Sequence, residues 1–139
     1  MEGGVPTFGG VLETTLYHEP DEREAVERFY GELLGLPLVA SWEDGRAFRV
    51  GAGVLLLFDR RRLEGRSGPI ADHGTTGAGH ACLRAGPEDY ERLRARLVEG
   101  EVEIVHDHEW GQGRRSFYFH DPAGNLLEIA DADLWPQSG

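Results

Sequence analysis

A single carboxylate stands inside an otherwise apolar run near the end of the chain. In the segment FYFHDPAGNLLEIAD (117–131), a DPAGN turn separates two runs of strand-like composition, and Glu128 lies in the middle of the second run. An ionised carboxylate in an apolar strand costs free energy unless it is paired or bound to a metal. Glu128 is therefore predicted to be functional; the alternative is a charge that reaches water at a sheet edge.

An internal repeat supplies two more candidates. A shift of 67 positions superposes Glu13 on His80 and Pro20 on Pro87, and an Ala-Gly pair precedes the last strand-like run of each half. Two copies are too few for a stacked solenoid, so the halves are predicted to pair about a pseudo-twofold axis. Paired modules present inward-facing residues at matching places, which brings Glu13, His80 and Glu128 to one cleft between them.

These three side chains offer two carboxylates and one imidazole. Such ligands suit a divalent ion such as Mn²⁺, Fe²⁺, Zn²⁺, Co²⁺ or Ni²⁺. The fourth equivalent place is Leu56 or Leu57, and leucine cannot bind a metal. Cys82 lies two residues from His80 and so points to the same sheet face, but no second thiol exists for a sulfur-rich structural zinc site.

The same residues also have simpler interpretations. Glu13 could form an ion pair across the cleft in a protein without metal, and His80 could be a core histidine that the backbone satisfies. As catalytic groups, Glu13 and Glu128 are carboxylates with the reach and tunable basicity to move a proton.

Further residues are candidates for a substrate pocket. Trp110 and Tyr118 lie in or beside strands that would form the cleft, and Arg49 and Arg115 could bind a substrate carboxylate or phosphonate. His73 belongs to an HGTTGAG segment that could fold over the cleft mouth. His106 and His108 alternate with acidic residues, so this stretch is interpreted as solvated surface.

The hydrophobic patterning predicts the elements that must position these residues. Residues 11–59 form a first module, with an alternating strand at 11–17, an amphipathic helix at 20–36 and three strand-like runs after it. Residues 60–79 contain five Gly and four Arg and are predicted to be a linker. A second module follows at 80–131, with a strand at 80–86, a helix at 87–100, strands near 101–108, 114–120 and 125–130, and a tail at 132–139. The predicted fold is one α+β domain of two paired βαβββ modules, whose curved mixed sheets enclose a cleft.

Composition limits the partners. A chain of 139 residues with 40% hydrophobic content has room for one core, and a formal charge of −11 argues against nucleic acid or an anionic membrane as the partner. The longest uncharged apolar run, 50–58, is far below the roughly 20 residues of a membrane-spanning helix. With no secretory signal pattern and a single cysteine, a cytoplasmic protein that binds a small molecule is expected.

Several catalytic and nucleotide-binding motifs are missing from the sequence. It contains no GxGxxG or GxxxxGK[ST] loop for phosphate and no GxSxG nucleophile elbow. Nucleotide binding and covalent serine catalysis are therefore not expected.

The motifs LETTLY, FYGELLGL, GAGHACL and SFYFHDPAGNLLEIAD carry a family resemblance, which covers residues 11–135. The chain resembles the vicinal oxygen chelate superfamily, which includes glyoxalase I, bleomycin and fosfomycin resistance proteins, methylmalonyl-CoA epimerase and extradiol dioxygenases. The resemblance implies paired βαβββ modules, often a homodimer, and a divalent metal that chelates two neighbouring oxygens. It places Glu13, His80 and Glu128 at metal-ligand positions, although the first is usually His and glyoxalase I-like members carry a fourth ligand.

The functional expectation follows from this resemblance. A metal-dependent lyase or isomerase of the glyoxalase type, or a dioxygenase, would act on a small molecule with adjacent oxygens. The alternative is a metal-free protein of the bleomycin-resistance type that binds an antibiotic between aromatic walls. A third reading is a regulatory module without catalytic activity.

Overall fold

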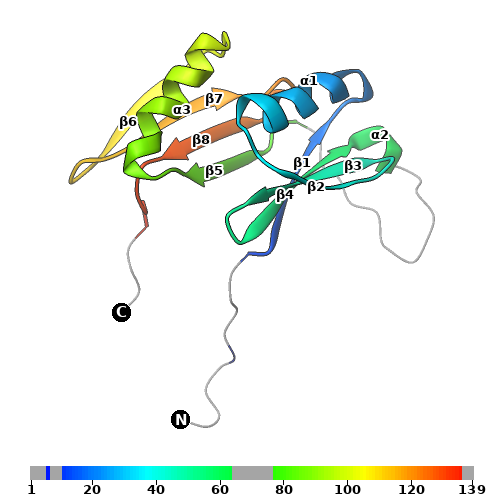
Figure 1. Ribbon diagram of the computed structural model, residues 1–139, viewed down its shortest axis with the longest axis horizontal. Helices are drawn as coiled ribbons and strands as arrows, with labels where there is room; N and C mark the ends of the chain where they lie inside the picture. Colours follow the sequence, from blue (N-terminus) through cyan, green and yellow to red (C-terminus); the bar gives the residue numbers. More distant parts are fainter. Residues whose placement is uncertain (1–5, 7–10, 64–76, 136–139) are drawn as a thin grey trace.

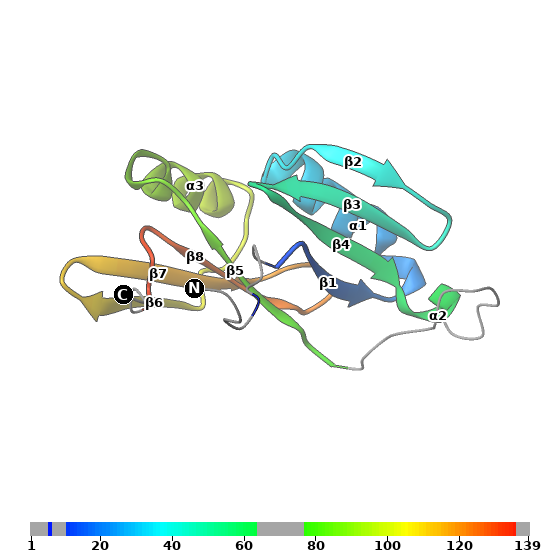
Figure 2. The same ribbon diagram turned by 90° about the horizontal axis from the view of Figure 1, so that it is seen from below.

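The chain folds as two βαβββ modules that lie side by side, each with its own four-stranded sheet and helix (Figures 1 and 2). The computed structural model describes residues 6, 11–63 and 77–135. The strands of the first module are β1 (Glu13–His18), β2 (Leu38–Ser41), β3 (Gly45–Val50) and β4 (Gly53–Asp59), in the sheet order β1-β4-β3-β2. Those of the second are β5 (His80–Arg84), β6 (His106–Gly111), β7 (Arg114–His120) and β8 (Leu126–Ala130), in the equivalent order β5-β8-β7-β6.

The predicted fold class is confirmed, including the mixed sheets. In each module the first strand runs parallel to the last, β1 with β4 and β5 with β8, and the other pairs are antiparallel. The helix of the second module is α3 (Pro87–Glu99); that of the first is a continuous segment of η1 (Pro20–Glu22), α1 (Arg23–Arg28) and the π-helical η2 (Phe29–Leu33). No helix in the described part of the chain is long and apolar enough to cross a membrane.

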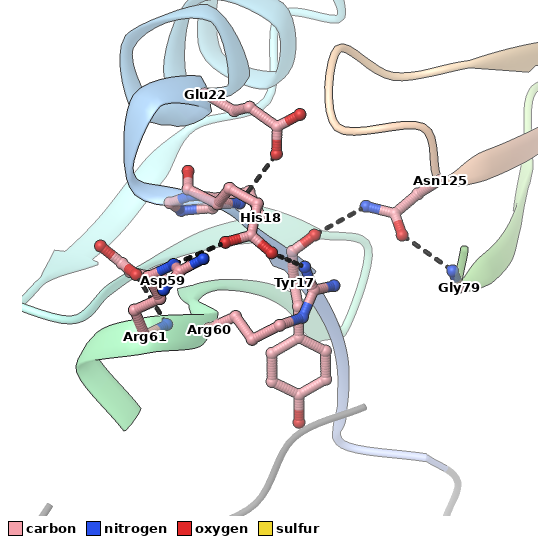
Figure 3. Close-up of polar contacts among 9 residues, drawn as sticks. Tyr17, His18, Glu22, Asp59, Arg60, Arg61, Gly79 and Asn125 are labelled. Atoms are coloured by element: carbon pink, nitrogen blue, oxygen red, sulfur yellow. Dashed lines mark hydrogen bonds and ion pairs between the residues drawn. The ribbon is translucent and has the colours of Figure 1, made fainter. Parts of the chain in front are cut away.

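Two elements differ from the predicted pattern. A short helix, α2 (Arg60–Leu63), opens the segment that was predicted to be a linker, and the buried Asp59 caps it by accepting a hydrogen bond from the Arg61 N–H at 2.9 Å (Figure 3). The strand predicted near 101–108 begins later, at His106. Glu101 adopts a positive φ of 65°, and Val102 N–H bonds back to the Leu97 carbonyl, so the chain is still leaving α3 at this point.

One core runs through both modules. The helix-facing sides of the two sheets contribute buried residues to a single cluster, and Phe29 of η2 packs on Phe119 of β7 with ring centroids 6.1 Å apart. Burial of large apolar side chains of this kind supplies most of the free energy of folding. The members are Leu16, Val26, Phe29, Tyr30, Phe48, Leu55, Leu57, Tyr90, Leu97, Phe117, Phe119, Leu127 and Ile129.

A smaller cluster lies on the opposite face of the first sheet. Ala47, Leu56 and Phe58 are buried there, and Tyr17 packs against them. Trp42 stacks on Phe58 with ring centroids 6.2 Å apart. The first sheet therefore carries apolar side chains on both of its faces.

The DPAGN turn joins the modules through hydrogen bonds that are largely buried. Asp121 accepts bonds from Tyr30 Oη at 2.7 Å and from the Asn125 backbone N–H at 2.8 Å. The Asn125 side-chain amide donates to the Tyr17 carbonyl of β1 at 3.1 Å, and its Oδ1 accepts from the Gly79 N–H at 2.8 Å (Figure 3). Gly124, with φ of 86°, supplies the left-handed residue that the turn requires. The turn that precedes Glu128 thus also fixes the relative position of the two halves.

Candidate functional site

The register of the second sheet aligns polar residues in rows on the face turned away from the helix. Cys82 of β5 is opposite Glu128 of β8, Glu128 is opposite Tyr118 of β7, and Tyr118 is opposite His106 of β6. Partners in register lie on the same face of a sheet, so these side chains are neighbours. We call this surface the Glu128 face; its members are His80, Cys82, His106, His108, Ser116, Tyr118 and Glu128.

His80 and Glu128 lie together on this face. His80 Nε2 is 3.5 Å from Glu128 Oε1, and the imidazole side chain is 49% exposed while the carboxylate is 7% exposed. His80 Nδ1 is 2.9 Å from the Leu126 carbonyl oxygen, which can only accept, so Nδ1 carries a proton. When the ring is neutral, Nε2 carries a lone pair that faces the Glu128 Oε1 atom. Two such electron-rich atoms repel each other unless a proton or a metal ion lies beside them.

Glu128 has unused capacity to bind a cation. Its second oxygen, Oε2, is buried and has no hydrogen-bond partner among the described residues. A buried charged oxygen without a partner is costly in a native protein and is a common sign of a functional site. The observation fits a divalent ion, because carboxylate and imidazole are the ligand types that such ions prefer.

Tyr118 and Cys82, which adjoin Glu128, remain protonated at neutral pH. Burial, and then the adjacent Glu128 carboxylate, raise the pKa of the Tyr118 hydroxyl, so the phenol stays a hydrogen-bond donor. Cys82 is an exposed residue, yet burial of its thiol, and then the negative charge of the adjacent Glu128 carboxylate, raises the pKa of that thiol to about 12. Cys82 is therefore not poised as a nucleophile.

This shifted thiol pKa gives a testable result. In protein stripped of metal with a chelator, alkylation of Cys82 by iodoacetamide should be slow at pH 8 and should still increase with pH beyond 10, because the thiolate is the reactive form. Glu128→Gln should lower the thiol pKa and accelerate the reaction at pH 8. Mass spectrometry of time points measures both rates, and equal rates in the two proteins would contradict the role of Glu128.

Glu13 lies at the start of β1, on the other sheet, and is exposed. It is opposite Val54 and so shares a face with Leu56, whereas Leu57 belongs to the core on the other side. Because Thr15 pairs with Leu56 as Cys82 pairs with Glu128, Leu56 is the counterpart of Glu128 in the first module. The register thus identifies Leu56, and not Leu57, as the fourth equivalent position, a choice that the sequence alone left open.

Within one chain the three predicted metal ligands are not assembled. The structure brings His80 and Glu128 together, but among residues 6, 11–63 and 77–135 no group of three or more His, Cys, Asp or Glu side chains is arranged to hold a metal ion. Glu13 stays a predicted ligand.

The predicted pocket residues lie on different faces of the two sheets. Tyr118 lies on the Glu128 face, and Trp110 reaches it through a 2.9 Å hydrogen bond from Nε1 to Ser116 Oγ. Arg49 is exposed on the face of Glu13 in the first sheet, since both residues are opposite Val54. His73 lies outside the described residues.

Arg115 departs from the expectation. It precedes Ser116 on β7 and therefore points to the helix-covered side of the sheet. Its guanidinium pairs with Glu91 at 2.7 Å and Asp131 at 3.1 Å and lies 4.5 Å from the Tyr90 ring centroid. Both carboxylates and the ring hold Arg115 away from the Glu128 face, so it is not among the residues that line that face.

Sequence reasoning missed two residues of this face. His106 and His108, interpreted as solvated surface, are indeed exposed, but their rings continue a row that starts at His80. His80 stacks on Tyr118, Tyr118 adjoins His106, and His106 adjoins His108, with ring centroids 6.4, 6.1 and 5.4 Å apart. The signal was present in the alternation of HDHEW, but without the register nothing connected that strand to Glu128.

Comparisons with known proteins identify the family of this chain. The profile of the Glyoxalase/Bleomycin resistance protein/Dioxygenase superfamily matches residues 20–129. A glutathione transferase FosA from Serratia marcescens is 35% identical over 105 residues, which cover 73% of this chain and 67% of that protein.

Solved structures give the same result. The crystal structure of a lactoylglutathione lyase from Agrobacterium tumefaciens superposes with a TM-score of 0.86 at 32% identity, covering 95% of this chain and all of that one. A glyoxalase/dioxygenase from Nostoc punctiforme shares the fold at 21% identity, with a TM-score of 0.65 over 91% of this chain and 97% of that one. The chain therefore belongs to the Glyoxalase/Bleomycin resistance protein/Dioxygenase superfamily.

Proposed function

We propose that the protein is a divalent-metal-dependent enzyme of the lyase, isomerase or transferase kind that acts on a small molecule with adjacent oxygens. The observation that carries the proposal is the buried Glu128 carboxylate, whose Oε2 lacks a partner while Oε1 faces His80 Nε2 at 3.5 Å. The names of the two relatives above 30% identity, a glutathione transferase and a lactoylglutathione lyase, support a substrate that carries or reacts with a thiol such as glutathione.

In this proposal His80 and Glu128 of one protomer and Glu13 of its partner hold the ion in a homodimer. The ion would act as a Lewis acid toward a substrate carbonyl or other oxygen. The Leu126 carbonyl fixes the His80 tautomer that exposes the Nε2 lone pair. Tyr118, kept protonated by its surroundings, donates a hydrogen bond toward negative charge, and a Glu13 or Glu128 carboxylate accepts a proton from the substrate.

Mixed dimers test the arrangement across two protomers. Glu13→Gln and Glu128→Gln subunits carrying different tags are co-expressed, and the mixed species is isolated by two affinity steps. Each mixed dimer would contain one site with both glutamates and one with neither, so it should bind about half the metal of the wild-type dimer, whereas each pure variant binds little. Metal content by atomic emission provides the readout. If the site forms within one chain, the mixed dimer would bind no more metal than the pure variants.

The competing function is metal-free binding of a planar or cationic compound. Exposed tryptophans favour it, since Trp42 is 47% and Trp110 43% exposed and both are adjacent to aromatic rings. The formal charge of −11 would attract cationic ligands. Metal analysis of protein purified without chelator separates the two functions: a binding protein would contain substoichiometric metal, and Glu128→Gln would leave its ligand affinity unchanged.

A further inference from the structure

A pair of histidines at the outer end of the Glu128 face has the geometry of a second metal site. His106 and His108 alternate on β6, the edge strand of the second sheet, and both are exposed. His106 Nε2 is 3.3 Å from His108 Nδ1. Two nitrogens bound to one tetrahedral ion at about 2.0–2.1 Å would lie about 3.3–3.4 Å apart. The observed separation is thus the one that two bonds to a shared ion require.

The strand environment holds the two rings in this arrangement. His106 packs beside Tyr118 with ring centroids 6.1 Å apart, and His108 lies against Trp110 at 4.5 Å with the rings edge to face. Trp110 is in turn anchored by its hydrogen bond to Ser116. Neighbouring rings limit the rotamers of both histidines, which lowers the entropy lost when an ion is bound.

The neighbouring charges also permit a cation. Asp107, between the two histidines, points to the other side of the strand, where its carboxylate pairs with Arg94 at 2.7 Å. The arginine is therefore held on the face opposite the imidazoles. The chain as a whole carries a formal charge of −11 and attracts cations.

We propose that His106 and His108 form a second binding site for a divalent transition-metal ion, separate from His80 and Glu128. With two protein ligands, the remaining coordination positions are filled by water or by an oxygen or nitrogen of a bound ligand. Imidazole donors place Cu²⁺ first in affinity, followed by Ni²⁺ and Zn²⁺. Tyr118 separates His106 from Glu128 in the register, so the second ion lies on the same face as the proposed catalytic site.

Cu²⁺ is the probe for this site. Protein purified without chelator, with its resident metal already quantified, is titrated with Cu²⁺ in a calorimeter while tryptophan emission is followed. One additional Cu²⁺ per chain should bind and quench the fluorescence of Trp110, whose ring adjoins His108. His106→Gln and His108→Gln should each weaken this event at least about tenfold, the loss that even an outer-shell partner causes. In a Trp110→Phe variant the ion should bind but the quenching should be lost.

The matched control is His120→Gln, an exposed histidine on the adjacent strand β7 that is not part of the pair. It should keep the full Cu²⁺ affinity. The proposal is overturned if no additional ion binds, or if the His106 and His108 variants bind Cu²⁺ as tightly as the wild type, which would leave the 3.3 Å contact as a ring-to-ring hydrogen bond. Glu128→Gln separates this inference from the proposed function, since it should lose the resident metal and keep the Cu²⁺ event.

Discussion

Glu128→Gln should weaken metal binding strongly and, at the same time, make the metal-free protein more stable. If Glu128 is a ligand in the proposed metal site, its replacement should weaken the affinity for the ion by about 100-fold or more, since outer-shell changes alone cost about 10–100-fold. In the metal-free protein the carboxylate is buried with Oε2 unpartnered, so replacing it with a neutral isostere removes a desolvation cost of about 1–3 kcal/mol. Metal analysis measures the loss of metal binding, and urea unfolding after chelation measures the stability of the metal-free protein.

This combination separates a functional role from a structural one. If Glu128 only stabilised the sheet, the glutamine variant would be less stable with or without metal. Adding the metal back should make the wild type more stable than the variant, because an ion that binds only the folded state stabilises the wild type and not the variant. Glu103→Gln is the control, since it replaces an exposed glutamate in the same module and should change neither quantity.

Asp121→Ala should cause the largest loss of stability, about 3–5 kcal/mol. Asp121 is 4% exposed and accepts hydrogen bonds from the Tyr30 hydroxyl, two backbone N–H groups of the DPAGN turn and the Asn125 amide. Its removal leaves several buried donors unpaired and releases the turn that joins the two modules. The midpoint of urea unfolding, with an unchanged dependence on urea, measures the loss.

Two variants calibrate this effect. Tyr30→Phe removes one donor and leaves the others in place, so it should cost about 1–2 kcal/mol. Asp107→Ala removes an exposed carboxylate from its ion pair with Arg94 and should cost less than about 1 kcal/mol. A loss for Asp121→Ala no greater than that for Asp107→Ala would show that the turn does not join the modules energetically.

The elements with strong periodicity were predictable from the sequence. The helix at 87–100 and the strand at 114–120 match α3 and β7 closely, because their patterns have a single period and their ends carry Pro, Gly or a turn. The strand near 101–108 was placed too early, since Val102 and Ile104 alternate as in a strand but pack on the core from the connection after α3. Helix α2 was not predicted because Asp59, which caps it, follows an apolar run and was interpreted as the end of that strand.

Part of the site could also be found from the sequence, but its geometry could not. The apolar surroundings of Glu128 and the repeat position of His80 pointed to the pair that the structure brings together. Sequence alone could not choose between Leu56 and Leu57 or place His106, because a shift of one residue in register moves every side chain to the other face. Arg115 was assigned to the pocket for the same reason, although its carboxylate partners lie on the helix side.

The separation of Glu13 from the His80 and Glu128 pair has a consequence for how assays of this protein should be run. If a neighbouring copy completes each ligand set, catalysis follows mass action: turnover per molecule should decline on dilution below the dissociation constant of the dimer, even though every subunit is still folded. Substrate or metal that bridges two copies would then resist that decline. Each protomer would then fold by itself, whereas catalysis would require a pair of protomers.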